Sequence, residues 1–224
     1  MLIATAIPRN KFEQIMKYLH FNDNLLNDGS GKLFKVQPLI EHANDKILKM
    51  GQPLGKHFSI DEAMEPYYGR NSIKQFIRGK PIRFGYKFWC LCTHDGCFIK
   101  FIPYEGKTDR DPGEPLGSKV VSNLSKDIVA EESYVHIDNF FTSLALLEDF
   151  GKRDINIIGT IRNNRIEKAT LESIKKQARG SYDIVRDTET NITIVRWNDN
   201  NVVIMATSVK NDNIVLREER LINA

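Results

Sequence analysis

Two aspartates have the residue type and the setting that metal-dependent chemistry on a phosphate requires. Asp61 closes the run His57–Asp61, and Asp138 follows the run Ser133–Ile137. Alternating apolar and polar residues predict a strand over each run, so both aspartates are expected at the ends of strands. Carboxylates held close together on rigid strands bind divalent cations, and two ions about 4 Å apart can activate the attacking oxygen and stabilise the leaving one in phosphoryl transfer. Because aspartate at a strand end is also ordinary turn chemistry, the spacing alone leaves both interpretations open.

A second candidate region is a basic segment over residues 70–87. It contains no Asp or Glu, and aromatic residues alternate with the basic ones. The basic residues are Arg70, Lys74, Arg78, Lys80, Arg83 and Lys87. A local positive field attracts polyanions, and phosphate contacts dominate the affinity of proteins for nucleic acids. The charge pattern fits a nucleic-acid interface, and it fits a solvated loop with a basic strand edge equally well.

The elements that would position these side chains follow from the hydrophobic periodicity. Helices are expected over residues 10–20, 38–50, 119–129 and 142–150. Strands are expected over residues 57–61, 82–92, 97–104, 133–137, 155–160, 181–187, 191–197 and 201–208. Three antiparallel strands followed by alternating strands and helices are typical of a mixed sheet with helices on its faces. In such a sheet Asp61 and Asp138 can converge.

The composition is that of an ordinary globular protein. The chain has 224 residues, of which 41% are hydrophobic and 27% are charged, and this balance argues against disorder, a collagen-like repeat and a coiled coil. No apolar run approaches the roughly 18 residues that a membrane span needs. The apolar start Met1–Ile7 lacks the basic region of a signal peptide. The net charge of +3 is too small to identify a nucleic-acid-binding protein by itself.

The three cysteines are clustered and odd in number. Cys90, Cys92 and Cys97 imply no disulfide framework, and a reducing compartment fits them better. Together with His94 they offer four soft ligands within eight residues, which could bind zinc. The spacing lacks a C-x-x-C pair, so we expect core cysteines beside a turn, with zinc as the alternative.

Several blocks of the sequence resemble the piggyBac-type transposases. Ser59–Met64, Gly69-Arg70 and Lys80–Lys87 are similar to the core signature of that family, and His136–Ser143 is similar to its second acidic block. The shorter blocks that continue the similarity are Arg9–Asn24, Lys32–Ile40, Gly159–Arg162, Arg179–Ser181 and Trp197–Asn200. The blocks occur in the family's order from residue 9 to residue 208, which makes the resemblance specific.

The resemblance implies an α/β fold, with a ribonuclease-H-like mixed sheet core, a β-rich insertion and N-terminal helices. The implied divisions are an N-terminal helical segment over 1–55, an incomplete core over 56–165, the insertion over 166–209 and a divergent tail over 210–224. Family members cut and paste DNA at TTAA sites and hold two divalent metals, Mg²⁺ or Mn²⁺, with three aspartates. By position, Asp61 resembles the first and Asp138 the second, so both are expected to be catalytic metal ligands. The basic segment resembles a DNA-facing one, and the implied location is the nucleus.

The family's third aspartate belongs to a Gly-Gly-Val-Asp-like block after the insertion, and nothing in residues 210–224 resembles that block. Two carboxylates would leave at least one metal under-coordinated, so we expect that this chain alone does not transpose DNA. The alternative is a repurposed module that binds DNA or protein, including a full-length transposase relative, without catalysis. A third hypothesis keeps an enzyme in which Glu218 or Glu219 supplies the missing ligand.

Overall fold

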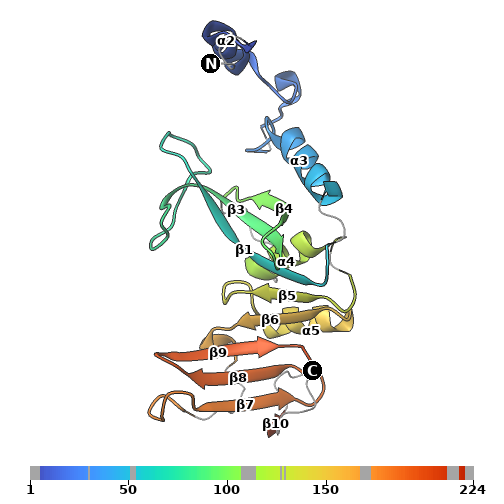
Figure 1. Cartoon of the computed structure of the whole chain (residues 1–224), viewed down its shortest axis with the longest axis vertical. Coiled ribbons are helices and arrows are strands. Elements are labelled where there is room, and N and C mark those ends of the chain that lie inside the picture. The colour runs from blue at the N-terminus through green and yellow to red at the C-terminus, as the bar shows by residue number, and fades with distance from the viewer. Residues whose placement is uncertain are drawn as a thin grey trace. The chain divides into compact units, whose positions relative to one another are not determined.

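One long β-sheet carries the candidate site residues (Figure 1). The computed structural model describes residues 6–29, 31–50, 54–106, 115–126, 128, 130–166, 173–210 and 217–219. The chain divides into two units, Met1–Met50 and Gly51–Ala224. The division of residues 56–209 into a core and an insertion stays a prediction. Most of the predicted tail over 210–224 lies outside the described residues.

The N-terminal unit contains the two helices that the periodicity predicts. Helix α2 spans Arg9–Tyr18 and helix α3 spans Gln37–Met50, with the short 3-10 helix η1 at Asn24–Leu26 between them. Both helices begin and end within two residues of the predicted bounds. Neither contains a buried residue, so the apolar stripe that predicts α2 is exposed: Phe12, Ile15, Met16 and Leu19.

The second unit is a mixed α/β structure, as predicted. Its strands are β1 (His57–Pro66), β2 (Gln75–Phe76), β3 (Phe84–Thr93), β4 (Phe98–Pro103), β5 (Tyr134–Ile137), β6 (Asn156–Thr160), β7 (Tyr182–Asp187), β8 (Thr193–Asn198), β9 (Val202–Thr207) and β10 (Arg217–Glu219). Its helices are α4 (Leu116–Ser125), α5 (Leu144–Lys152) and the 3-10 helix η2 (Asn163–Arg165). In the described part of the chain all ten strands join one sheet.

The strand order is β10-β7-β8-β9-β6-β5-β1-β3-β2, and β4, which is not part of this order, also pairs with β3. At the centre, β1, β5 and β6 run parallel, whereas β3 and β4 are antiparallel to their neighbours. The later strands β7, β8 and β9 form an antiparallel meander that joins the sheet through β6 and β9. The prediction of a mixed sheet, with three antiparallel strands followed by alternating strands and helices, is therefore confirmed.

The prediction that Asp61 ends its strand is wrong. Strand β1 continues for five residues beyond Asp61 to Pro66, because it pairs with β3 residue by residue from Phe58 to Pro66. The stretch Glu62–Glu65 shows no clear apolar alternation in the sequence, and the cross-strand pairing overrides that weak local signal. Asp138, in contrast, directly follows β5 as predicted.

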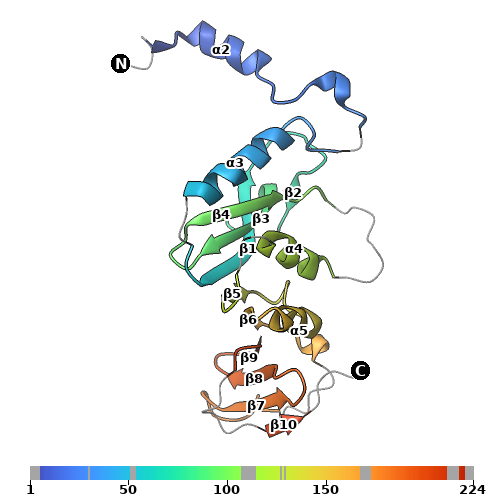
Figure 2. The same ribbon diagram turned by 90° about the vertical axis from the view of Figure 1, so that its right-hand side faces the viewer.

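The core lies under one face of the central strands, where α4 and α5 pack (Figure 2). The fully buried side chains that meet there include Phe58, Ile60, Leu91, Ile99, Val121, Leu124, Leu147 and Phe150. Ser143 caps α5 by accepting a hydrogen bond from the Leu146 N–H, as an N-cap serine does. Among the described residues, none of the helices has the length and apolar character that crossing a bilayer demands.

Candidate functional site

Three carboxylates meet where β1 and β5 run side by side. Asp61, Glu62 and Asp138 each offer an oxygen, and these oxygens all lie within 4.8 Å of one another. The parallel register pairs Ile60 with Ile137, so the residues that follow, Asp61 and Asp138, are brought together. The structure thus assembles the two predicted aspartates and adds Glu62, which the sequence reasoning missed.

The loop after β5 holds Asp138 in place. The Asp138 carboxylate accepts the backbone N–H of Phe140 at 2.8 Å, and its carbonyl accepts the Thr142 hydroxyl at 2.8 Å. Gly159 on β6 makes this packing possible, because a Cβ atom there would lie 2.4 Å from Thr142 Oγ1. The ring of Phe140 stacks on the buried Trp89 of β3, with centroids 5.3 Å apart. Contacts with both β6 and β3 therefore fix the loop.

Arg165 on η2 donates hydrogen bonds to several backbone carbonyls of the same loop. Its Nη1 donates to the carbonyls of Asn139 at 3.0 Å and Phe140 at 3.3 Å, and also to the carbonyl of Thr142. The neighbouring Arg162 donates through Nε to the Asn139 side chain at 3.2 Å. A charged donor shared by several carbonyls forms stronger hydrogen bonds than a neutral one. Arg165 is therefore a positioning residue for the loop that presents Asp138.

Two lysines of the basic segment face this cluster. Lys80 Nζ lies 2.9 Å from Glu62 Oε1. Burial on its own would raise the pKa of Glu62, but the Lys80 hydrogen bond and the charges of Lys87 and Lys80 outweigh it and lower that pKa. Burial raises the pKa of Asp61, and the negative charge of Glu62 adds to the increase. The ammonium of Lys87 lies 3.7 Å from the centroid of the Trp89 ring, and burial lowers its pKa.

The donor set fits a hard divalent cation. All three ligands are carboxylates, the oxygen donors that Mg²⁺ and Mn²⁺ prefer. Asp61 and Asp138 are exposed, whereas Glu62 is half-buried, so water and a substrate can reach the two aspartates. A Mg²⁺ ion keeps several waters and uses few carboxylates, which suits a cluster that is open to solvent.

The cysteine cluster has a different environment. Cys90 is buried, Cys92 is half-buried and Cys97 is exposed, and all three are free thiols. Burial raises the pKa of Cys90 to about 12, so its thiol is protonated at neutral pH in the metal-free chain. In the part of the chain that the structure describes, the only group of three ligand atoms that meets this closely is the carboxylate one.

The rest of the basic segment lies on an arm, defined here as residues 66–86. The arm contains the outer ends of β1 and β3 together with β2, and it projects from the sheet (Figure 1). Five of the six predicted DNA-binding residues belong to it: Arg70, Lys74, Arg78, Lys80 and Arg83. Of these, Lys80 turns to Glu62, and the sixth residue, Lys87, lies just beyond the arm over Trp89. The basic segment therefore places two lysines beside the carboxylate cluster and its other basic residues on a separate surface.

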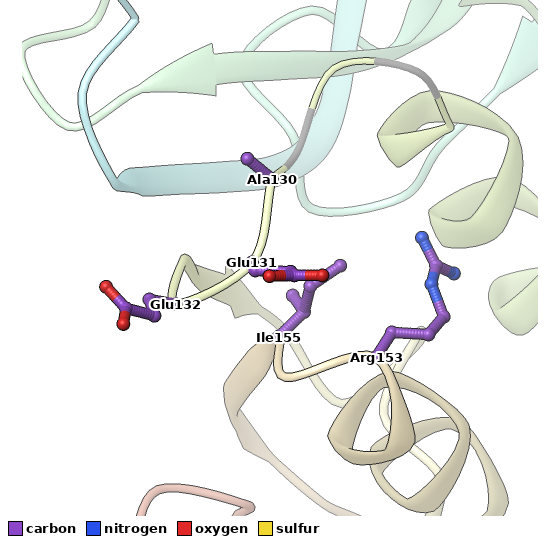
Figure 3. A pocket seen from close by; sticks show the side chains of 5 residues that line it. All are labelled: Ala130, Glu131, Glu132, Arg153 and Ile155. Atoms are coloured by element: carbon purple, nitrogen blue, oxygen red, sulfur yellow. The ribbon is translucent and has the colours of Figure 1, made fainter.

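A hollow on the surface lies away from this site. It measures about 770 Å³ and is lined by Ala130, Glu131, Glu132, Arg153 and Ile155. In Figure 3 the Glu132 carboxylate points away from Arg153, and Glu132 pairs instead with Lys56. Because its charged groups do not converge, this hollow lacks the arrangement of polar groups that a binding site requires.

The comparisons with known proteins agree with this geometry. A transposase family model, described as Transposase IS4, matches residues 1–223. The human PiggyBac transposable element-derived protein 3 is 42% identical over 216 residues, which are 93% of this chain and 36% of that protein. The human PiggyBac transposable element-derived protein 2 is 38% identical over 212 residues, 90% of this chain and 35% of that protein. The chain therefore spans about a third of the length of these curated relatives.

A solved structure shows the same fold. The piggyBac transposase, in its synaptic complex with hairpin DNA, matches 96% of this chain and 46% of its own with a TM-score of 0.83 at 23% identity. This likeness shows the fold, and the prediction of a ribonuclease-H-like mixed sheet is confirmed. The family model places the chain among the DDE-type transposase domains. The chain belongs to the piggyBac transposase family, among whose relatives are transposable element-derived proteins.

Proposed function

We propose that this chain supplies the first two metal ligands and a DNA-contacting surface for the DNA cut-and-paste chemistry of its family. The observation that supports the proposal is the convergence of Asp61, Glu62 and Asp138 within 4.8 Å across two adjacent strands. Asp61 and Asp138 would hold the divalent cation, Mg²⁺ or Mn²⁺. When bound, such an ion activates the attacking oxygen and stabilises the leaving oxygen of a phosphodiester.

The chain's own residues would do the positioning. Arg165 and Gly159 fix the loop of Asp138, and Lys80 balances the charge of Glu62. The basic residues of the arm would contact phosphates without identifying the base sequence. The piggyBac transposase that shares this fold assembles with hairpin DNA, which supports DNA as the partner here and the nucleus as the location.

Calorimetric titration with Mn²⁺, and with Mg²⁺ in parallel, tests the metal site. Asp61→Asn and Asp138→Asn should each weaken the affinity about tenfold or more, since each removes a ligand. Glu65→Gln is the matched control, because Glu65 is an exposed carboxylate of the same strand outside the cluster, and its affinity should equal that of the parent. Equal binding by the parent and both aspartate variants would overturn the metal assignment.

A second candidate function is a DNA-binding module without catalysis. It is favoured by the ion pair between Lys80 and Glu62, which gives the cluster an internal cation, and by the position of the other basic residues on a separate arm. A nicking assay on a TTAA-containing duplex separates the two candidates. Salt-dependent DNA binding without Mn²⁺-dependent nicking supports the module, whereas nicking that Asp138→Asn abolishes supports a working metal site.

A further inference from the structure

We infer that the arm binds unpaired nucleotides of a DNA strand, stacking bases on a row of aromatic rings while its basic side chains contact the phosphates. This inference rests on the proposed function, because it assumes that the chain binds DNA. It adds which form of DNA the arm prefers and which residues make the choice.

Four rings lie in two stacked pairs along one side of the arm, here called the row. Phe76 of β2 is directly opposite Phe84 of β3, and their centroids are 4.8 Å apart. Two residues further along β3, on the same side of the strand, Tyr86 stacks on Tyr67 with centroids 4.8 Å apart. The Tyr67 ring lies across Gly69, where a Cβ atom would be 2.4 Å from its hydroxyl oxygen. Glycine at position 69 therefore leaves the room that the Tyr67 ring needs.

The outer rings of the row remain open to solvent. Phe76 is 58% exposed and Phe84 is 48% exposed. A cross-strand aromatic pair stabilises a hairpin, which accounts for their contact with each other. Hairpin stabilisation does not explain why two adjacent phenylalanines are each about half exposed, because valine or threonine would stabilise a two-residue strand as well. Adjacent exposed apolar groups on a projecting element mark a surface that a partner covers.

The charge around the rings identifies the partner's chemistry. Between Glu65 and Asp95 the sequence contains no acidic residue, and four other basic residues besides Lys80 belong to the arm: Arg70, Lys74, Arg78 and Arg83. Lys74 Nζ lies 5.6 Å from the centroid of the Phe84 ring. Exposed rings alternating with cations match a strand that alternates bases with phosphates, and this combination is how proteins bind single strands.

Unpaired bases fit this surface better than a duplex. Inside a duplex each base face is covered by its neighbours, so a ring cannot stack on it without unstacking the helix at a cost of a few kcal/mol. The row is also close to the carboxylates along the same strand: Glu65, the partner of Tyr86, lies four residues after Asp61, or about 13 Å along β1. A strand whose phosphate reaches the carboxylates can therefore continue onto the rings.

Fluorescence anisotropy with three labelled probes tests the inference: oligothymidylate, an abasic oligonucleotide of the same length, and a duplex. The abasic strand has the same charges without bases. The parent chain should bind oligothymidylate about tenfold more tightly than the abasic strand, since stacking on an aromatic side chain contributes about 1–3 kcal/mol per base. Phe76→Leu/Phe84→Leu should reduce that preference to near equality and leave the affinities for the abasic strand and the duplex unchanged.

Two further variants keep the outcome decisive. Phe98→Leu is the matched control, because Phe98 of β4 is also exposed but lies outside the arm, and it should retain the parent's preference. If the double variant does not fold, Phe76→Leu alone is used, because this exposed position of an edge strand tolerates the change. It should remove about half of the preference for oligothymidylate over the abasic strand, on a logarithmic scale. Arg78→Gln/Arg83→Gln should weaken all three probes and reduce the salt dependence.

The outcomes separate the two proposals. Equal affinity of the parent for oligothymidylate and the abasic strand, or an unchanged preference in the leucine variants, would overturn the stacking inference while DNA binding stands. Binding of none of the probes would overturn DNA binding, and the stacking inference with it.

Discussion

Strand β1 belongs to two regions that hold their side chains in opposite ways. Up to Ile60 it is a central strand, paired with β3 on one edge and β5 on the other, and Phe58 and Ile60 are each 1% exposed. Beyond Ile60 it pairs with β3 alone and leads into the projecting arm. The half that is paired on both edges anchors the strand directly before the carboxylates of Asp61 and Glu62, whereas the arm keeps an open face that a ligand can cover.

The same contrast divides the basic segment. Lys80 and Lys87 are adjacent in sequence to the other four basic residues, yet they lie beside the carboxylates. A run of like charges in a sequence therefore does not define one surface, because the fold distributes its members between the carboxylate cluster and the outer part of the arm. Variants that damage one region and spare the other test this separation.

The largest effect is expected from Gly159→Ala at the carboxylate region. Its Cβ would lie 2.4 Å from Thr142 Oγ1 and 2.8 Å from the Ile137 carbonyl, so the Asp138 loop must shift. Overpacking of this kind costs about 2–3 kcal/mol, measured as the free energy of unfolding in urea. Mn²⁺ binding should be lost, while oligothymidylate binding by the arm persists in the folded protein.

Gly151→Ala is the control for that change. Gly151 lies in α5, and its nearest neighbour to an added Cβ is 4.0 Å away. Because alanine favours a helix over glycine, this variant should be neutral or more stable by up to about 1 kcal/mol. A loss of stability equal to that of Gly159→Ala would contradict the steric explanation.

A smaller effect is expected from Arg165→Met. The change keeps the apolar stem and removes the charged donor, which leaves the carbonyls of Asn139, Phe140 and Thr142 without it. We expect a loss of about 2 kcal/mol in unfolding free energy and a Mn²⁺ affinity several-fold lower. Arg162→Met, which removes only an exposed contact with a side chain, should cost about 0.5 kcal/mol or less. Equal effects of the two variants would contradict the positioning role.

The sequence predicts the scaffold of the carboxylate region better than its details. The strand of β5 follows from alternation, and it places Asp138 correctly. Glu62 was missed because alternation assigns neighbouring residues to opposite sides of a strand, and only the structure shows that both side chains reach the same corner. The acidic pair Asp61-Glu62 beside an acid-free basic segment was the one available signal.

The arm was also missed, for a related reason. Strand β2 has two residues, too few for any periodicity, and the stretch Glu62–Glu65 resembles a loop. Both become strands only because β3 offers a partner for each of them. Long-range pairing of this kind cannot be inferred from local propensity, whereas the long periodic segments of α2 and α3 could be.

Lys80→Gln sharpens the boundary between the two regions. If Lys80 acts as an internal cation of the cluster, its removal should increase the Mn²⁺ affinity about threefold to tenfold, because roughly 1 kcal/mol of repulsion between like charges at a hydrated site disappears. Lys152→Gln, which breaks an ion pair with Glu148 on α5, should leave that affinity unchanged. A weaker affinity in Lys80→Gln would show instead that Lys80 orients Glu62 for the metal.

The smallest effect concerns the pH dependence of the metal-free chain. Because the pKa of Asp61 is raised in the folded state, the folded chain retains the proton longer than the unfolded chain does. Asp61 therefore favours the folded state below its ordinary pKa of 3.8 and loses that contribution as the pH rises through the raised value. Asp61→Asn removes the charge and preserves an oxygen for the Glu62 N–H, so with a chelator present it should be more stable than the parent at pH 7. For this partly exposed group the gain is less than about 1 kcal/mol, and it should vanish near pH 3.5 in thermal unfolding. A gain that is equal at both pH values would arise from packing. A gain confined to neutral pH would show that the ionised Asp61 carboxylate destabilises the folded metal-free chain, a free-energy cost that only a bound cation offsets.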